Sequence, residues 1–171
     1  MANVAGSFLL SRLVTPMAIA KSALNLQRVQ SRELLFQTLE ELNIPFLFGV
    51  EGTCELPLID GCAEHPSVQY IQVLHENIAV GAAMGFGRMT GKPGVCVLHV
   101  TPGVAHCVAN LFNAWKARIP VIVIGGQQHT ELSIQEPILW SSTVDMVRQY
   151  TRVHFSKGEQ SGAKRHQKSQ T

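Results

Sequence analysis

The chain has 171 residues, and its apolar fraction of 46% and charged fraction of 15% are typical of a globular domain with a buried core, which excludes disorder over the whole length. The net charge of +2 divides into +4 over residues 1–32, −6 over residues 33–150 and +4 over residues 151–171. The acidic body excludes nucleic acid as the main partner, and no apolar run reaches the roughly 18 residues of a membrane helix, which argues against a membrane partner.

The two basic ends have compositions unlike the body. Residues 5–23 mix Leu, Val, Ile and Ala with Ser, Arg and Lys and contain no acid, which is compatible with a transit peptide, an unstructured leader or an added helix. Residues 156–171 consist mostly of Lys, Gln, Ser and Gly and predict a polar tail. We therefore expect a leader over 1–30, one domain over 31–155 and a tail over 156–171. The expected location is the cytoplasm, with mitochondria as the alternative.

Hydrophobic periodicity predicts alternating helices and strands in the body. The elements in chain order are a helix from Ser31 that ends before Pro45, a strand over 46–50, a short helix through Leu58, a strand over 68–73, a helix over 77–89, a strand over 95–100, a helix over 104–116, a strand over 121–124 and a weaker helix over 143–150. The strands are short and nearly continuously apolar, as in parallel sheets buried on both faces. The pattern predicts an α/β fold, a doubly wound and mostly parallel sheet with helices on both faces.

Polar and glycine residues follow each predicted strand, where open α/β sheets bind ligands. In chain order these are Glu51-Gly52-Thr53-Cys54-Glu55, Leu74-His75-Glu76, then His99, Thr101, Pro102 and Gly103, and finally Gly125-Gly126-Gln127-Gln128. Two interpretations stay open, a functional rim or ordinary polar loops between strands and helices.

Glu76 stands between an apolar strand and a helix made of Ala, Gly, Val and Met. An apolar crevice would raise its pKa and make it a proton donor or acceptor near neutral pH. Alternatively, the carboxylate only favours the N-terminus of the helix.

Cysteines and the other histidines indicate no metal site. The cysteines form no CxxC pair and have no histidine at ligand spacing, so we expect reduced, mostly buried thiols, with disulfides as the alternative. They are Cys54, Cys62, Cys96 and Cys107. Four histidines are expected to be surface or packing residues: His65, His106, His129 and His154.

Several ordered blocks resemble the N-terminal, pyrimidine-binding domain of thiamine diphosphate-dependent decarboxylases over residues 31–155. The blocks are Phe48-Gly49-x-x-Gly52-x-x-Glu55-Leu56-Pro57, His75-Glu76, Gly81-Ala82-Ala83-Met84-Gly85-Phe86-Gly87-Arg88-Met89-Thr90-Gly91-Lys92-Pro93-Gly94, Pro102-Gly103, Asn113-Ala114-Trp115 and Ile124-Gly125-Gly126-Gln127-Gln128. Within the family the chain is most similar to benzoylformate decarboxylase, through Glu55-Leu56-Pro57, Leu98-His99, Asn113-Ala114-Trp115 and Gln127-Gln128, with acetolactate synthase as the close neighbour.

This resemblance implies roles for individual residues. Glu76 would bind a ring nitrogen of the aminopyrimidine of thiamine diphosphate and so promote formation of the ylid. His99 would bind substrate and transfer a proton, and Thr53 would contact the substrate carboxylate. The implied cofactor-binding residues are Glu76, Gly52, Thr53, Pro102, Gly103 and Gln127.

The chain also departs from the family pattern. Glu51 replaces a usual Pro and brings a charge close to the pocket, Val100-Thr101 stand where small residues are usual, and His106 stands where Asn is common. The family binds Mg²⁺ and the diphosphate through a Gly-Asp-Gly followed by Asn, and neither Asp60 nor Asp145 has that context. The helix and the Gly-Pro-Val strand expected after Phe155 are also absent.

Three functions fit these features. The first is the pyrimidine half of a thiamine diphosphate site for a small 2-oxo acid substrate, in a homo- or hetero-oligomer whose partner supplies Mg²⁺ and the diphosphate site, so that the chain alone is inactive. The second is a truncated, inactive remnant of such an enzyme. The third is a non-enzymatic α/β binding module.

Overall fold

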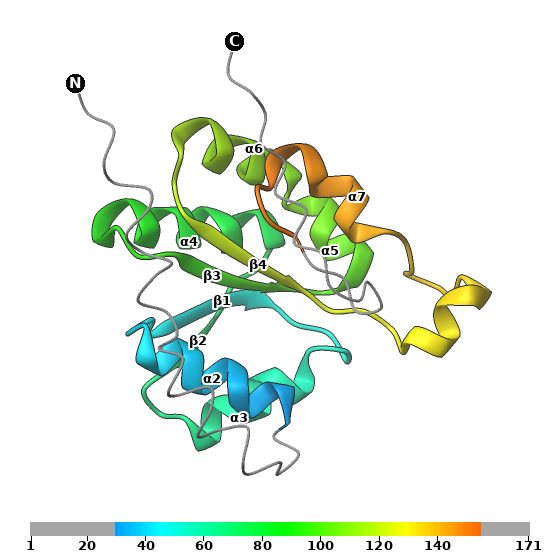
Figure 1. Ribbon diagram of the computed structural model, residues 1–171, viewed down its shortest axis with the longest axis horizontal. Coiled ribbons are helices and arrows are strands. Elements are labelled where there is room, and N and C mark those ends of the chain that lie inside the picture. The colour runs from blue at the N-terminus through cyan, green and yellow to red at the C-terminus, as the bar shows by residue number, and fades with distance from the viewer. Residues whose placement is uncertain (1–29, 155–171) are drawn as a thin grey trace, which may run out of the picture. The chain divides into compact units, whose positions relative to one another are not determined.

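The computed structural model describes residues 30–154, and the expected leader and tail therefore lie outside the described residues except for residue 30. Four parallel strands form the sheet, in the order β2-β1-β3-β4. They are β1 (Phe46–Val50), β2 (Gln69–Gln72), β3 (Gly94–Leu98) and β4 (Val121–Gly125). The predicted α/β fold with a parallel sheet is confirmed (Figure 1).

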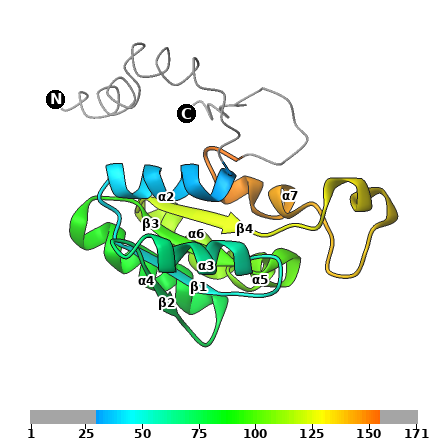
Figure 2. The same ribbon diagram turned by 90° about the horizontal axis from the view of Figure 1, so that it is seen from below.

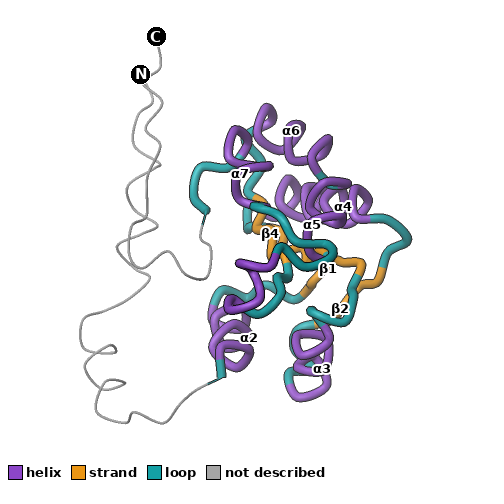
Figure 3. The backbone as a smooth tube through the Cα atoms, turned by 90° about the vertical axis from the view of Figure 1, so that its right-hand side faces the viewer, coloured by secondary structure: helices purple, strands orange, loops and turns teal. Residues whose placement is uncertain are grey.

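Helices cover both faces of this sheet. α2 (Ser31–Glu41) and α3 (Leu56–Glu64) lie on one face, and α4 (Glu76–Thr90), α5 (Val100–His106) and α6 (Val108–Ala117) lie on the other (Figures 1 and 3). Figure 2 shows α2 and α3 from their own side of the sheet. The chain continues through the 3₁₀ turn η1 (Thr130–Gln135), α7 (Thr143–Val147) and the 3₁₀ turn η2 (Arg148–Tyr150). No helix among the described residues is long and apolar enough to cross a membrane.

β3 separates the two halves of the core. All five of its residues are buried, and successive side chains point to opposite faces. Val95 and Val97 pack with Phe36 of α2, whereas Cys96 and Leu98 pack with residues of α4 and α6. The prediction that all four strands are buried on both faces is wrong for the two edge strands: three of the four residues of β2 are exposed, and no residue of β4 is buried.

Two glycines, Gly94 in β3 and Gly87 in α4, allow α4 to pack closely against the sheet. A Cβ on Gly94 would collide with the backbone of Ala83 in α4, and a Cβ on Gly87 would lie 2.7 Å from the carbonyl oxygen of Pro120. The helix therefore approaches the starts of β3 and β4 more closely than side chains on these glycines would allow.

The structure differs from the sequence patterns at three places. β3 ends at Leu98, not at Val100, and Val100 begins α5 with a φ of 38°. The single helix expected over 104–116 is two helices, α5 and α6, separated at Cys107. The short helix expected to end near Leu58 continues to Glu64.

All four cysteines are free of disulfides in the structure, and the expectation that they are mostly buried holds for only two of them. Cys96 and Cys107 are buried, Cys62 is half-buried and Cys54 is exposed. Burial raises the pKa of Cys107 to about 12, so this thiol is inert near neutral pH.

His65 connects α2 to the end of α3. Its Nε2 lies 3.1 Å from Glu33 Oε2 and its Nδ1 lies 3.2 Å from Glu40 Oε1. The ring also stacks on Phe36, with 4.7 Å between ring centroids. His65, expected to be a surface or packing residue, is therefore also the centre of an ion-pair cluster. Partial burial lowers the pKa of His65, but the bonds to Glu33 and Glu40 outweigh it and leave the pKa above 6.5.

We expect His65→Gln to destabilise the protein in a pH-dependent way. The raised pKa of His65 stabilises the fold below pH 6.5, and this contribution is lost as the pH rises through the folded-state pKa. Hydrogen bonds from Gln37 and His65 lower the pKa of Glu33, so its contribution is present above pH 4.5 and lost as the pH falls.

The difference in Tm between wild type and His65→Gln should therefore be largest between pH 4.5 and 6.5, as measured by circular dichroism. His129→Gln is the control, because the His129 side chain is 62% exposed and its nearest carboxylate, on Glu131, is 3.9 Å away. A difference in Tm that does not change with pH would contradict this account of the cluster.

Candidate active site

The loops that follow the four strands meet at one edge of the sheet. Val50 of β1 pairs with Leu98 of β3, and Leu98 pairs with Gly125 of β4. Gly49 of β1 pairs with Gln72 at the end of β2. All four carboxyl ends therefore lie at the same rim, as the sequence predicts, and two clusters of polar side chains stand on it.

The first cluster is centred on Glu55, whose side chain is only 1% exposed. His99 Nδ1 lies 2.7 Å from Oε2 of this carboxylate. The backbone N–H of Gly52 donates to Oε2 at 3.0 Å, and the N–H of Val100 donates to Oε1 at 3.4 Å. One buried carboxylate thus joins the loop after β1 to the loop after β3.

Two glycines make room for this pair. A Cβ on Gly52 would collide with the imidazole ring of His99, and a Cβ on Gly126 would collide with Oε1 of Glu55. Gly52, expected to contact the cofactor, therefore also forms the surface on which the His99 ring lies. The glycines at this rim are required by close packing and not by the local backbone angles.

We expect Gly126→Ala to destabilise the protein by about 1–3 kcal/mol, because the added methyl group would displace the Glu55 carboxylate. Gly85→Ala is the matched control: a Cβ there meets nothing within 4 Å, and Ala stabilises an exposed helical position by about 0.5–1 kcal/mol. Urea unfolding of both variants measures the effects. Equal free energies of unfolding for the two variants would show that the Glu55 carboxylate moves aside at no cost in free energy.

The contact with Glu55 fixes how His99 can act. With the carboxylate at Nδ1, a neutral ring carries its proton there and has its lone pair on Nε2. The His99 side chain is 26% exposed, and no hydrogen bond to Nε2 occurs among the described residues. A histidine oriented in this way can accept and return a proton at Nε2.

Val100, directly after His99, is held in a strained conformation. Its φ of 38° is in the left-handed region, which β-branched residues rarely adopt, and its side chain is completely buried. The hydrogen bond from its N–H to Glu55 and the packing around it maintain this conformation. The sharp turn directs the chain from β3 into α5 directly behind His99.

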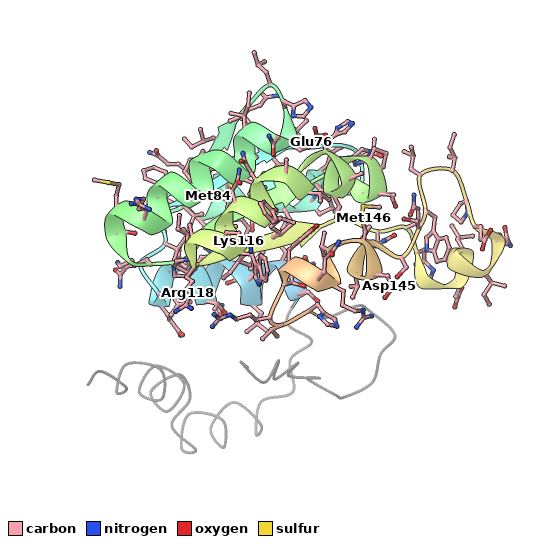
Figure 4. The ribbon with its side chains drawn as sticks, turned by 90° about the horizontal axis from the view of Figure 1, so that it is seen from above. Glu76, Met84, Lys116, Arg118, Asp145 and Met146 are labelled. Atoms are coloured by element: carbon pink, nitrogen blue, oxygen red, sulfur yellow. The ribbon has the colours of Figure 1, made fainter. Side chains whose placement is uncertain are left out.

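The second cluster is centred on Glu76, the first residue of α4. Its side chain is 12% exposed, and Oε2 lies 2.9 Å from Nδ1 of His106 at the end of α5. Figure 4 shows Glu76 at the N-terminal end of α4, beside α5. His75 precedes it, accepts a hydrogen bond at Nδ1 from the N–H of Asn77 at 3.1 Å, and stacks on His106 with 5.0 Å between ring centroids.

The expectation that burial would raise the pKa of Glu76 is wrong. Partial burial does act in that direction, but the residue's own backbone N–H, the hydrogen bond from His106 and the charges of His106 and His75 outweigh it. The pKa of Glu76 therefore lies below its ordinary value, and the carboxylate is ionised at neutral pH. Glu76 also occupies the first helical position, as the alternative interpretation expects.

Gly103 lies between the two clusters. Its N–H donates to the carbonyl oxygen of His99 at 2.9 Å, and a Cβ on it would lie 3.5 Å from Cγ of Glu76. The first turn of α5, which includes Pro102, thus lies between Glu76 and His99, and at Gly103 this turn carries no side chain. Glu76, His99, Gly52 and Gly103 are brought together, as the sequence predicts.

Three other rim residues lie in different surroundings. Thr53 is exposed in the turn after β1. Gln127 Nε2 donates to Ser141 O at 3.1 Å and to Thr143 Oγ1 at 3.2 Å, so its amide joins β4 to the start of α7. Glu51 accepts from Tyr70 Oη at 2.6 Å, which turns its charge toward β2.

Sequence reasoning missed the roles of two residues. Glu55 was recognised as part of a motif but given no function, although an acid two residues before Pro57 at the start of a helix is a detectable signal. His106 is a surface residue as expected, with its side chain 54% exposed, but it also pairs with Glu76. Its position where the family usually has Asn was the available signal.

Comparison with known proteins identifies the family. Residues 30–145 match the family described as thiamine pyrophosphate enzyme, N-terminal TPP binding domain. The chain is 34% identical over 102 residues to an acetolactate synthase of Mycobacterium bovis, covering 60% of this chain and 16% of that protein. It is 35% identical over 95 residues to an acetolactate synthase large subunit of Lactococcus lactis, covering 56% and 16% respectively.

Two solved structures share the fold. A Mycobacterium smegmatis protein described as a thiamin diphosphate-dependent enzyme has a TM-score of 0.67 and 26% identity, covering 74% of this chain and 24% of that one. A Rhodococcus jostii thiamine diphosphate-dependent 4-hydroxybenzoylformate decarboxylase has a TM-score of 0.63 and 28% identity, covering 71% and 22%. The chain spans 16% of the length of the two acetolactate synthases compared above. It belongs to the thiamine pyrophosphate enzymes, through a match to their N-terminal TPP binding domain.

Proposed function

We propose that this chain forms the aminopyrimidine half of a thiamine diphosphate site in an enzyme that acts on a 2-oxo acid, as a decarboxylase or an acetolactate synthase-like protein. The observation that carries the proposal is the position of Glu76, a largely buried carboxylate at the rim of a domain of this family. A carboxylate there can hold a proton against a ring nitrogen of the bound cofactor.

The residues around Glu76 fit such a ring. Gly103 presents no side chain beside the carboxylate, and a Cβ on it would lie 3.5 Å from Cγ of Glu76. The cluster also offers a carboxylate oxygen as an acceptor and an imidazole as a donor within 2.9 Å of each other. When bound, thiamine diphosphate supplies the carbon nucleophile and the electron sink that decarboxylation of a 2-oxo acid requires.

Glu76 would act by sharing a proton at Oε2. In the free chain this oxygen accepts from His106 Nδ1, and in the complex it would share a proton with the cofactor's ring nitrogen. His106 would remain beside the carboxylate and oppose its protonation, because the hydrogen bond from its Nδ1 favours the ionised form of Glu76. His106 thus sets how readily Glu76 takes up the proton.

His99 and Thr53 would form the substrate side of the site. Glu55 holds the His99 ring so that Nε2 can bind a substrate oxygen or transfer a proton to the reacting carbon. Glu55 is a positioning residue, because it acts through His99. Thr53, exposed in the adjoining turn, supplies a hydroxyl for the substrate carboxylate.

A partner domain or subunit would supply the Mg²⁺ and diphosphate site. The two aspartates of this chain are both engaged in ion pairs on the surface: Asp60 with Arg32 at 3.2 Å and Asp145 with Arg148 at 2.6 Å. Asp60 lies in α3 and Asp145 lies in α7. We expect a homo- or hetero-oligomer in which the cofactor lies between this domain and that partner.

Reconstitution tests this proposal. The purified chain is mixed with Mg²⁺, thiamine diphosphate and an acetolactate synthase lacking its own N-terminal domain, and CO₂ release from pyruvate and benzoylformate is measured. CO₂ release that requires the chain supports the catalytic function. Cofactor binding that depends on the chain, without turnover, would instead identify an inactive remnant. Absence of cofactor binding would exclude both the catalytic function and the inactive remnant.

A further inference from the structure

A second ligand chemistry is available at the Glu76 cluster. His75 comes from the loop before α4, Glu76 from the first turn of α4 and His106 from the end of α5. One ligand atom of each lies within 4.8 Å of the other two. Two separate segments of the fold therefore bring two imidazoles and a carboxylate to one point of the rim.

This ligand set is suited to a borderline-soft transition metal. Imidazole and carboxylate ligands bind Zn²⁺ with bond lengths of about 2.0–2.2 Å, which places two ligand atoms roughly 3.3 Å apart. His106 Nδ1 and Glu76 Oε2 already lie 2.9 Å apart, so an ion can replace the proton that they share with a small displacement. Mg²⁺, which prefers oxygen ligands, is disfavoured by the two ring nitrogens.

The third ligand, His75, needs a larger adjustment. Its Nδ1 accepts the N–H of Asn77, and its ring stacks on that of His106. Both contacts are weak and solvent-exposed, so rotation of the His75 ring can exchange them for a metal bond. The His106 side chain is 54% exposed, which gives an ion direct access from solvent.

The other histidines of the described residues offer no comparable site. His65 already contacts Glu33 and Glu40, and His99 is held by the buried Glu55. His129 is exposed with one distant carboxylate, and His154 Nε2 lies 2.8 Å from the Arg148 guanidinium. Among the described residues, the cluster around Glu76 is the group of three His, Cys, Asp or Glu residues whose ligand atoms lie close enough together to hold one metal ion.

We propose that His75, Glu76 and His106 form a binding site for a divalent transition metal ion of the zinc class, with water at the remaining coordination position. The site exists in the chain alone and needs no partner. Its consequence rests on the proposed function: an ion bound to Glu76 occupies the carboxylate that the cofactor requires, so metal and thiamine diphosphate exclude each other.

The test uses Co²⁺ as a spectroscopic probe on the full chain without a histidine tag. Wild type should develop visible d–d absorption of a low-coordinate site at one equivalent, and Zn²⁺ should abolish it by displacement. His106→Asn and Glu76→Gln should each weaken Co²⁺ binding by at least about tenfold, since loss of even an outer-shell partner costs 10–100-fold. His129→Asn, a matched loss of an exposed imidazole, should bind like wild type.

Circular dichroism of each variant separates loss of a ligand from loss of the fold. His75→Gln removes the third ligand and leaves the contact between Glu76 and His106 in place. Equal Co²⁺ affinity of wild type and His106→Asn, or no d–d absorption in wild type, would overturn the proposal and leave an ion pair only. Because this titration contains no thiamine diphosphate, its outcome is independent of the proposed cofactor function. Inhibition of the reconstituted enzyme by Zn²⁺, weaker in His106→Asn, tests the competition separately.

Discussion

Glu76→Gln should lower CO₂ release by the reconstituted enzyme by about 100-fold or more, because an amide cannot take up and return a proton at the position of Oε2. The variant keeps the size of the side chain and can still accept a hydrogen bond from His106. Its thermal stability should therefore change little, so that the loss is catalytic. Turnover from pyruvate or benzoylformate at saturating cofactor is the measurement.

Glu131→Gln is the control for this substitution, because it makes the same chemical change at a side chain that is 89% exposed. Glu131 belongs to η1, which contributes no residue to either of the two clusters. Turnover by the Glu131→Gln protein should match wild type. Equal turnover by the Glu76→Gln protein and wild type would contradict the catalytic role of Glu76.

Glu55→Leu should destabilise the protein by about 3 kcal/mol, the second large effect that we expect. The substitution removes the acceptor for the N–H groups of Gly52 and Val100 and leaves His99 without its partner. Breaking a buried pair by removing one member typically costs 3–5 kcal/mol, and partial exposure of His99 places the effect at the lower end of this range. Urea unfolding measures it.

Glu55→Gln separates shape from charge at the same position. The amide keeps the volume of the side chain and one acceptor oxygen, so the loss should be only about 1 kcal/mol. If Glu55 positions His99, turnover should fall in this variant even where the fold is retained, and its pH profile should shift. A Glu55→Leu protein as stable as wild type would refute the structural role of the buried carboxylate.

The fold was predictable because its main determinants are local in sequence. Short apolar runs such as Phe46–Val50, each followed by a helix, are sufficient to indicate a parallel sheet. The rim followed from the same pattern, since carboxyl ends of parallel strands meet at one edge. Glu76 and His99 could therefore be chosen before the structure was known.

Contacts between distant segments could not be predicted in the same way. Glu55 and His99 are separated by 44 residues, and only the closed fold shows that the carboxylate is buried against the ring. Val100 looked like the end of a strand because β-branched residues favour strands, but its N–H bonds Glu55 and its φ is positive. His106 and Glu76 are 30 residues apart, and their contact adds to the effect of the residue's own backbone N–H in lowering the pKa of Glu76.

The most direct test of the central claim measures what Glu76 does to the cofactor. In the reconstituted complex without substrate, exchange of the thiazolium carbon's proton for deuterium is followed by NMR after rapid quenching. Glu76→Gln should slow this exchange by about 100-fold or more while thiamine diphosphate remains bound. Equal exchange rates in wild type and Glu76→Gln, with the cofactor bound in both, would contradict the claim that this chain activates the cofactor through Glu76.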